Sequence, residues 1–193
     1  MRLDILNRGY SPGTKFLFAV IRLMSGHPLP DAARLVFYRP DFYGSRAKEF
    51  THEAMRGPSA WSVADRELMA AYVSTVNGSA FCVGAHSATA TQAYHDGAKV
   101  QAVLASLDTA PVEEPLRATL QMLGMLTRDG TVDAGEMRDV LAAGVSPGQV
   151  KDALAVCAAF DTTNRLADAF GFEVLRPEGF DAGAKYLLKR GYR

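Results

Sequence analysis

Apolar residues recur at helical period along most of this chain, in runs separated by proline, glycine and aspartate, and strand-like alternation is scarce. The stretch at 37–44, which holds Pro, Tyr and Phe, is expected to be an irregular connector. The pattern therefore predicts an all-α protein of about seven or eight helices. Their expected ranges are about 13–25, 45–55, 62–77, 80–95, 96–107, 112–128, 133–143 and 147–170.

Residues with side chains suited to capping precede several of these helices. Ser62 and Asp65 have the spacing of a capping box, and Asp133 is placed to cap the helix that follows it. Ser146 precedes a proline at the first helical position, where the missing N–H costs nothing. The basic segment 185–193 is expected to be a short docked or frayed end.

Length and charge limit the classes of function. The 193 residues suit a single domain, 1–193, in which 1–34 form an N-terminal helical extension. Twenty-one basic residues balance twenty-one acidic ones without long runs of either sign, which gives no electrostatic footprint for nucleic acid. The apolar run 16–21 is too short to span a bilayer and makes a poor signal peptide. Small molecules or copies of the chain itself are the expected partners.

The two cysteines do not form a recognisable framework. Cys82 and Cys157 are 75 residues apart, which fits neither a disulfide scaffold nor clustered zinc ligands. A reducing cytoplasm is the expected compartment. Cys157 lies in an apolar helical stretch and is expected to pack in the core.

The segment most suggestive of chemistry places Cys82 one helical turn before His86. Residues four apart on a helix are neighbours, so the thiol and the imidazole can approach each other. Ser79 shares this face and, following Asn77-Gly78, is a candidate N-cap residue. Cys82 would then lie in the first turn, where free N–H groups and the helix dipole lower a cysteine pKa. Cys82 is therefore a candidate thiolate nucleophile.

Structural roles compete with each catalytic assignment. A free cysteine is often simply buried, and His86 is equally consistent with a hydrogen-bonded core histidine. Glu67 lies on the preceding helix, and antiparallel packing would leave it roughly 15 Å or more from the connecting turn, at ~1.5 Å per residue. That geometry alone does not bring it beside Cys82. Its neighbours Asp65 and Arg66 favour a solvated, charged face.

A metal centre is not expected. His27, His52 and His95 are the remaining histidines besides His86, and no pair has the close spacing of known zinc patterns. The sequence likewise indicates no cofactor.

The order of these residues resembles a known motif. Glu67, twelve positions, Ser79-x-x-Cys82, three residues and His86 follow the Glu, Cys-x-x-Cys, His pattern of the alkylhydroperoxidase D-like proteins, in the carboxymuconolactone decarboxylase superfamily. The resemblance covers about residues 35–175, the expected family core. The neighbouring sequence fits too, at Arg66-Glu67-Leu68, Cys82-Val83-Gly84-Ala85-His86-Ser87 and Asn164-Arg165-Leu166-Ala167-Asp168.

The resemblance implies an all-helical fold that assembles into homo-oligomers: dimers, trimers or hexamers. Members with both cysteines cycle between dithiol and disulfide while they reduce hydroperoxides. By position, Cys82 would be the attacking thiolate, and His86 and Glu67 would form its proton relay through water.

Ser79 is where this chain departs from the motif. A serine can donate a hydrogen bond to the Cys82 thiolate, but it cannot form the disulfide that resolves a sulfenic acid. A peroxidase using Cys82 would therefore need a resolving thiol from outside, or from Cys157.

Three hypotheses follow from these residues. The leading one is a cytoplasmic, oligomeric, thiol-dependent oxidoreductase with peroxiredoxin-type antioxidant activity, in which an external thiol regenerates Cys82. The second is a cofactor-free lyase or hydrolase of the carboxymuconolactone decarboxylase type, in which His86 and Glu67 transfer protons on a lactone-like substrate. The third is a non-catalytic helical oligomer that has lost the redox pair.

Overall fold

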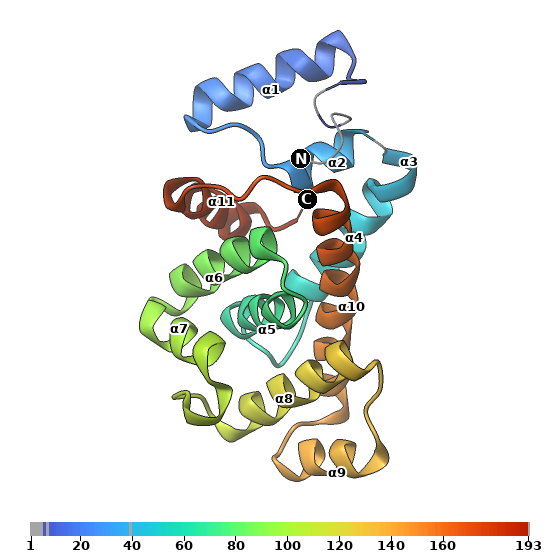
Figure 1. Cartoon of the computed structure of the whole chain (residues 1–193), viewed down its shortest axis with the longest axis vertical. Helices are drawn as coiled ribbons and strands as arrows, with labels where there is room; N and C mark the ends of the chain where they lie inside the picture. The colour runs from blue at the N-terminus through green and yellow to red at the C-terminus, as the bar shows by residue number, and fades with distance from the viewer. Residues whose placement is uncertain (1–5, 7, 39, 193) are drawn as a thin grey trace.

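The fold is helical throughout the part of the chain that the computed structural model describes, residues 6, 8–38 and 40–192. The expectation of an all-α protein is thereby confirmed (Figure 1). The elements are α1 (Pro12–Ser25), α2 (Asp31–Tyr38), α3 (Pro40–Tyr43), α4 (Ser45–Arg56), α5 (Val63–Val76), α6 (Ala80–Tyr94), α7 (Gly97–Ala105), the 3-10 turn η2 (Leu107–Thr109), α8 (Glu114–Asp129), α9 (Ala134–Ala142), α10 (Pro147–Phe170) and α11 (Pro177–Arg190).

Local capping explains why the helices begin where the sequence predicts. Ser62 and Asp65 form the expected capping box at the start of α5. Asp133 accepts hydrogen bonds from the first turn of α9, and Ser146 caps α10 with Pro147 at the first helical position. These side chains satisfy backbone N–H groups that a helix start leaves without partners.

Two regions expected to lack long helices are helical, so the structure has more helices than the seven or eight predicted. The supposed connector at 37–44 contains the end of α2 and the single-turn α3. Buried Leu35 anchors α2 in the core, and the Asp31 side chain accepts a hydrogen bond from the Glu173 backbone at 3.0 Å. The burial of Leu35 and the bond to Glu173 both depend on residues far away in the sequence, so the local sequence pattern does not predict this helix. Of the basic segment 185–193, residues 185–190 likewise belong to α11.

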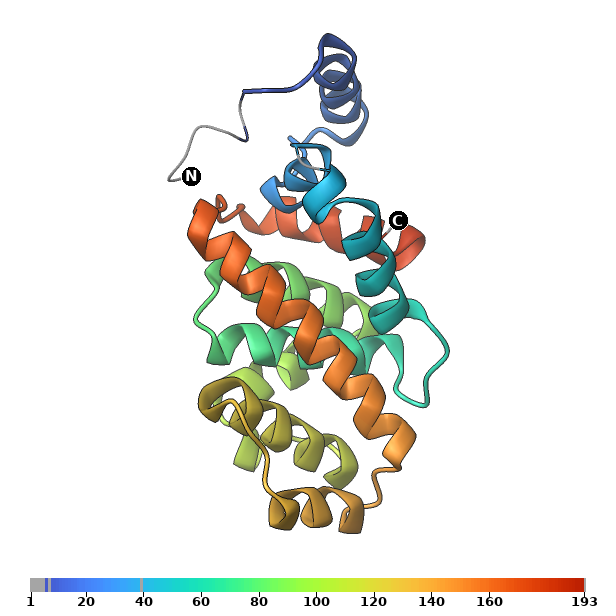
Figure 2. The ribbon, with the colours of Figure 1, turned by 90° about the vertical axis from the view of Figure 1, so that its right-hand side faces the viewer.

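Helix α5 is the centre of the molecule. It packs against α6, α10 and α8, and α10 crosses its neighbours diagonally in Figure 2. Leu68, Met69, Ala70 and Val73 are fully buried on α5. Since a helix that is covered on most sides must be apolar on most sides, charged residues buried on α5 stand out.

Helix α11 lies along α6, a contact visible in Figure 1. Gly84 makes the approach possible, because a Cβ atom there would lie 2.5 Å from the ring of Phe180. Phe180 in turn packs on Phe81, with ring centroids 6.0 Å apart. Helix α11 is therefore held against the helix that carries Cys82 and His86.

Helix α1 stands apart from this body in Figures 1 and 2. None of its residues is buried, and Leu23 and Met24 are 85% and 84% exposed. Among the described residues, no helix has the length and apolar character needed to cross a membrane.

Candidate functional site

Glu67 is completely buried, which contradicts its interpretation as a solvated surface charge. Three donors surround its carboxylate. Arg56 donates to Oε1 at 2.6 Å, the Tyr192 hydroxyl donates to the same oxygen at 3.0 Å, and Nδ1 of His86 lies 2.8 Å from Oε2. Although burial alone would raise the pKa of Glu67, the hydrogen bond and charge of His86 and the charge of Arg56 lower it. Glu67 is therefore held as a carboxylate.

Antiparallel pairing of α5 and α6 explains how Glu67 reaches His86. Glu67 lies ten residues before Asn77, and His86 lies eight residues after Gly78, so the two face each other across the hairpin. Glu67 is far from the connecting turn, as expected, but His86 lies about as far from the turn along the other helix. Within the described residues, no hydrogen bond joins the sulfur of Cys82 to either of them.

The carboxylate fixes the orientation of the His86 ring. An ionised carboxylate only accepts hydrogen bonds, so Nδ1 must carry a proton and donate it to Glu67. In the neutral ring, Nε2 then has a free lone pair and can take up a proton. The edge of the ring contacts Phe160, with centroids 4.2 Å apart. The Glu67 carboxylate thus fixes the tautomer and the orientation of the His86 ring.

Tyr192 is a member of the site that the sequence did not predict. Besides its bond to Glu67, its hydroxyl lies 3.5 Å from Nδ1 of His86, and its ring is stacked on that imidazole at an interplanar angle of 19°. Arg56 lies over the ring, 5.2 Å from its centroid. Burial and the Glu67 charge raise the Tyr192 pKa well above its usual value, so the hydroxyl is a neutral donor. No local pattern could have signalled it, since Glu67 and His86 lie more than a hundred residues away in the sequence.

Cys82 is buried, with 1% of its surface exposed, in a cluster with Leu35, Phe81, Ala167 and Phe172. Burial raises the pKa of the thiol to about 12, and the neighbouring Ser79 hydroxyl, which lowers the pKa, only partly offsets this. The expectation of a lowered pKa in the first helical turn is therefore wrong for this closed structure. The free energy needed to desolvate the thiolate is larger than the stabilisation that the helix N-terminus provides.

Ser79 occupies the N-cap position of α6, but its side chain makes no capping bond. Its hydroxyl donates to the Asp168 carboxylate on α10 at 3.1 Å. The Asp168 charge raises the pKa of Cys82, whereas the nearby Ser79 hydroxyl lowers it. The predicted cap is instead a link between two helices beside the cysteine.

The remaining cysteine and histidines lie outside this group or support it differently. Cys157 is fully buried, as expected, and burial raises its pKa to about 11. Nδ1 of His52 accepts a hydrogen bond from the Tyr192 backbone N–H at 3.2 Å. In the described part of the chain, no group of three His, Cys, Asp or Glu side chains is placed to hold a metal ion.

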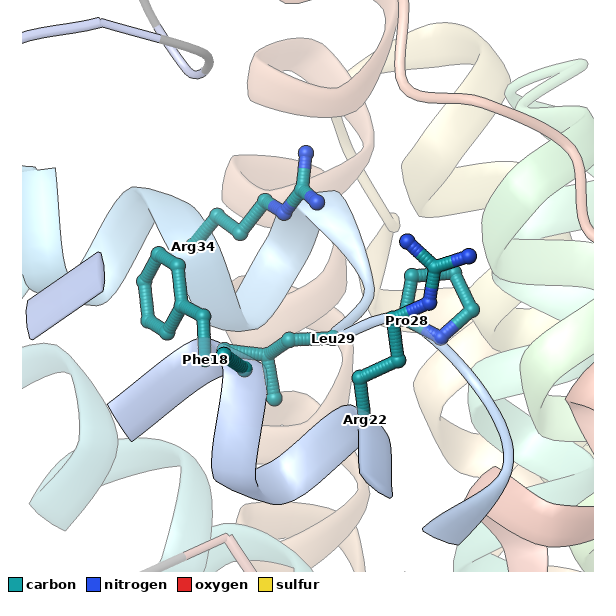
Figure 3. A pocket seen from close by; sticks show the side chains of 6 residues that line it. Phe18, Arg22, Pro28, Leu29 and Arg34 are labelled. Atoms are coloured by element: carbon teal, nitrogen blue, oxygen red, sulfur yellow. The ribbon is translucent and has the colours of Figure 1, made fainter. Parts of the chain in front are cut away.

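An open pocket lies elsewhere, between α1 and the start of α2. Figure 3 shows Phe18 and Leu29 on its apolar side, flanked by the guanidinium groups of Arg22 and Arg34. None of its lining residues belongs to the group around Glu67.

Comparisons with known proteins place this arrangement in a family context. Residues 43–123 match the carboxymuconolactone decarboxylase family. No curated protein sequence matches the chain significantly.

Solved structures share the fold. A peroxidase-related protein from Silicibacter sp. TM1040 superimposes with a TM-score of 0.77 at 21% identity, over 92% of this chain and 93% of that one. A peroxidase-related protein from Ralstonia eutropha JMP134, described as an alkylhydroperoxidase AhpD core, gives 0.71 at 20% identity, over 91% of each chain. A cysteine-to-alanine variant of the debrominase Bmp8, in complex with 2,3,4-tribromopyrrole, gives 0.69 at 17% identity, over 92% of this chain and 90% of that one.

Proposed function

We propose that this protein is a thiol-dependent oxidoreductase that reduces hydroperoxides at Cys82, as a member of the carboxymuconolactone decarboxylase family, whose model residues 43–123 match. The observation that carries the proposal is the buried Glu67–His86 pair, 2.8 Å apart, one helical turn beyond the cysteine on α6. A thiol with a raised pKa reacts only if a base removes its proton, and His86 is the base at hand.

The proposed reaction begins when a hydroperoxide enters the site. The Cys82 proton passes, through water, to Nε2 of His86, while the Nδ1 hydrogen bond to Glu67 stabilises the resulting imidazolium. The thiolate attacks the terminal peroxide oxygen, an S–O bond forms and the O–O bond breaks. The leaving alkoxide takes the proton back from His86. The products are a sulfenic acid and an alcohol, so the sulfur is oxidised by two electrons and the peroxide is reduced.

Regeneration requires an external thiol in this scheme. Ser79 cannot form a disulfide, and Cys157 is fully buried in the other core cluster. The external thiol attacks the sulfenic sulfur, water leaves and a mixed disulfide forms. A second thiol then attacks that disulfide, restores the Cys82 thiol and departs as an oxidised dimer of the reductant.

The test is peroxide consumption by the full chain with tert-butyl hydroperoxide and dithiothreitol. Cys82→Ser is expected to abolish turnover, because Cys157, the other cysteine, is fully buried in the core. Cys157→Ser is the matched control and is expected to keep the rate of the wild-type protein. Full turnover by Cys82→Ser would refute the proposal.

A second function is favoured by a different observation: among the described residues, the Glu67–His86 pair has no hydrogen bond to the sulfur of Cys82. A cofactor-free lyase or hydrolase acting on a lactone-like substrate would use Nε2 of His86 to move a proton and would not need a thiolate. The fold is not confined to peroxide chemistry, since one structural neighbour is a debrominase. For this reaction, Cys82→Ser is expected to be active and His86→Gln inactive.

The proposal includes an oligomeric state and a cellular location. We expect a homo-oligomer, a dimer, trimer or hexamer, in the cytoplasm, with 1–34 as an extension beside the family core at 35–175. The exposed apolar residues of α1, among them Leu23 and Met24, support self-association. Size-exclusion chromatography with light scattering measures the assembly directly.

A further inference from the structure

The side chain of Tyr192 occupies the Glu67–His86 site as a ligand would. Its phenol ring is stacked on His86, its hydroxyl donates to Glu67 Oε1 at 3.0 Å, and Arg56 lies over the ring. Phe160 contacts it edge-on, with centroids 6.5 Å apart. We call these four surrounding side chains, Arg56, Glu67, His86 and Phe160, the Tyr192 seat.

The seat has the composition of a small-molecule site more than of ordinary packing. The His86 and Phe160 rings lie beside the phenol ring, with centroids 6.4 and 6.5 Å away, and charged groups meet its hydroxyl. Apolar rings combined with a few convergent polar groups are typical of ligand pockets. Glu67 is fully buried, and a charge in that position is retained only when donors satisfy it. The hydroxyl is one of three such donors. A packing contact alone would require none of this polar matching.

Access to the pair requires that Tyr192 leave. Glu67 is 0% exposed and His86 is 4% exposed, so no substrate can touch either group in the closed arrangement. Tyr192 lies beyond α11, which ends at Arg190, and is reached through a turn at Gly191. The opening of a helix end costs less than the opening of the core, so this segment is the one suited to move.

We infer that the Tyr192 seat is a binding site for a small phenol, which enters by displacing Tyr192 and takes over its hydrogen bond to Glu67. The seat specifies a planar ring, a hydroxyl donor on its rim and an electron-rich face for Arg56. This inference goes beyond peroxide reduction and does not depend on Cys82.

The test compares p-cresol, which reproduces the tyrosine side chain, with toluene, which lacks the hydroxyl. Binding is measured by titration calorimetry for the wild-type protein, Tyr192→Phe and Tyr192→Ala. Tyr186→Ala is the matched control, because Tyr186 lies on α11 and is 56% exposed.

The affinity for p-cresol is expected to rise from the wild-type protein through Tyr192→Phe to Tyr192→Ala. The wild-type protein must first release its own tyrosine, so a change of about tenfold or more is expected between the first and the last. Toluene is expected to bind Tyr192→Ala about tenfold or more weakly than p-cresol, because it leaves the buried carboxylate one donor short. Tyr186→Ala is expected to behave like the wild-type protein.

Two results would overturn the inference. Equal p-cresol affinity in all four proteins would place the phenol elsewhere, and equal affinity of Tyr192→Ala for toluene and p-cresol would remove the role of Glu67. If Tyr192→Ala does not fold, Tyr192→Phe decides, since it keeps the ring but gives up the hydroxyl bond. Its p-cresol affinity must then exceed that of the wild-type protein, and failure to do so refutes the inference.

Discussion

Replacing Glu67 with glutamine is the sharpest perturbation of the buried pair. Glutamine keeps the volume of the side chain but presents one acceptor oxygen and one donor NH₂ group where glutamate presents two acceptors. Donors from Arg56 and Tyr192 converge on Oε1, and His86 donates to Oε2. Whichever way the amide turns, its NH₂ group faces at least one donor.

The expected cost follows from what remains buried. The Arg56 side chain is 11% exposed and would lose its anionic partner. Removal of one member of a buried ion pair costs about 3–5 kcal/mol, and the oxygen that glutamine retains places this variant near the lower limit, about 3 kcal/mol. For a chain of this size, that corresponds to a fall in Tm of about 6–12 °C.

Thermal and urea unfolding of Glu67→Gln measure this loss, with Glu49→Gln as the control. Glu49 is an exposed residue on α4, so its substitution is expected to change the unfolding free energy by less than about 0.5 kcal/mol. If Glu67→Gln changed stability no more than Glu49→Gln, the description of Glu67 as the ionic centre of the site would be wrong.

The same comparison has a defined pH dependence. The folded-state pKa of Glu67 lies below its usual value of 4.5, so its stabilising contribution is complete above that value. It is lost as the pH falls through the lower, folded-state pKa. The stability difference between the wild-type protein and Glu67→Gln is therefore expected to narrow in acid and to be constant near neutrality.

Further substitutions test the helix contacts around the site. Gly84→Ala places a Cβ atom 2.5 Å from the Phe180 ring and is expected to destabilise the fold by about 1–3 kcal/mol in urea unfolding. Gly183→Ala, where an added Cβ meets nothing within 4 Å, is expected to be neutral or stabilising by up to about 1 kcal/mol, and an equal loss in both variants would refute the packing argument. Ser79→Ala removes the hydroxyl whose presence beside Cys82 lowers the pKa of the thiol, so thiol titration is expected to show a still higher value. A lower value would mean that the serine raises that pKa.

The helical frame could be predicted because its signals are local. Ser62, Asp133 and Ser146 lie within a turn of the backbone groups that they satisfy, and apolar period defines the long helices between them. Helix α2 was missed because it depends on partners far along the chain, such as the hydrogen bond between Asp31 and Glu173. The local pattern of apolar and capping residues does not predict such contacts.

The candidate site divides in the same way. Cys82 and His86 are linked by helical spacing, so their shared face could be predicted from sequence alone. The partnership of Glu67 with His86 depends on how two helices cross, and the position of Tyr192 depends on α11 folding back on α6. The state of the thiol could not be predicted either, because its pKa depends on burial that only the packed structure defines.

The turn at Gly191 determines where Tyr192 lies relative to the Glu67–His86 pair. Its φ of 67° is in the left-handed region, and a Cβ atom there would lie 2.6 Å from the ring of His52. Any other residue at this position would redirect the chain and shift Tyr192, so that Glu67 would lose one of its three donors although neither Glu67 nor His86 had been replaced. A substitution at Gly191 would therefore change how firmly Tyr192 is held over the Glu67–His86 pair, and no side chain of that pair would need to be replaced.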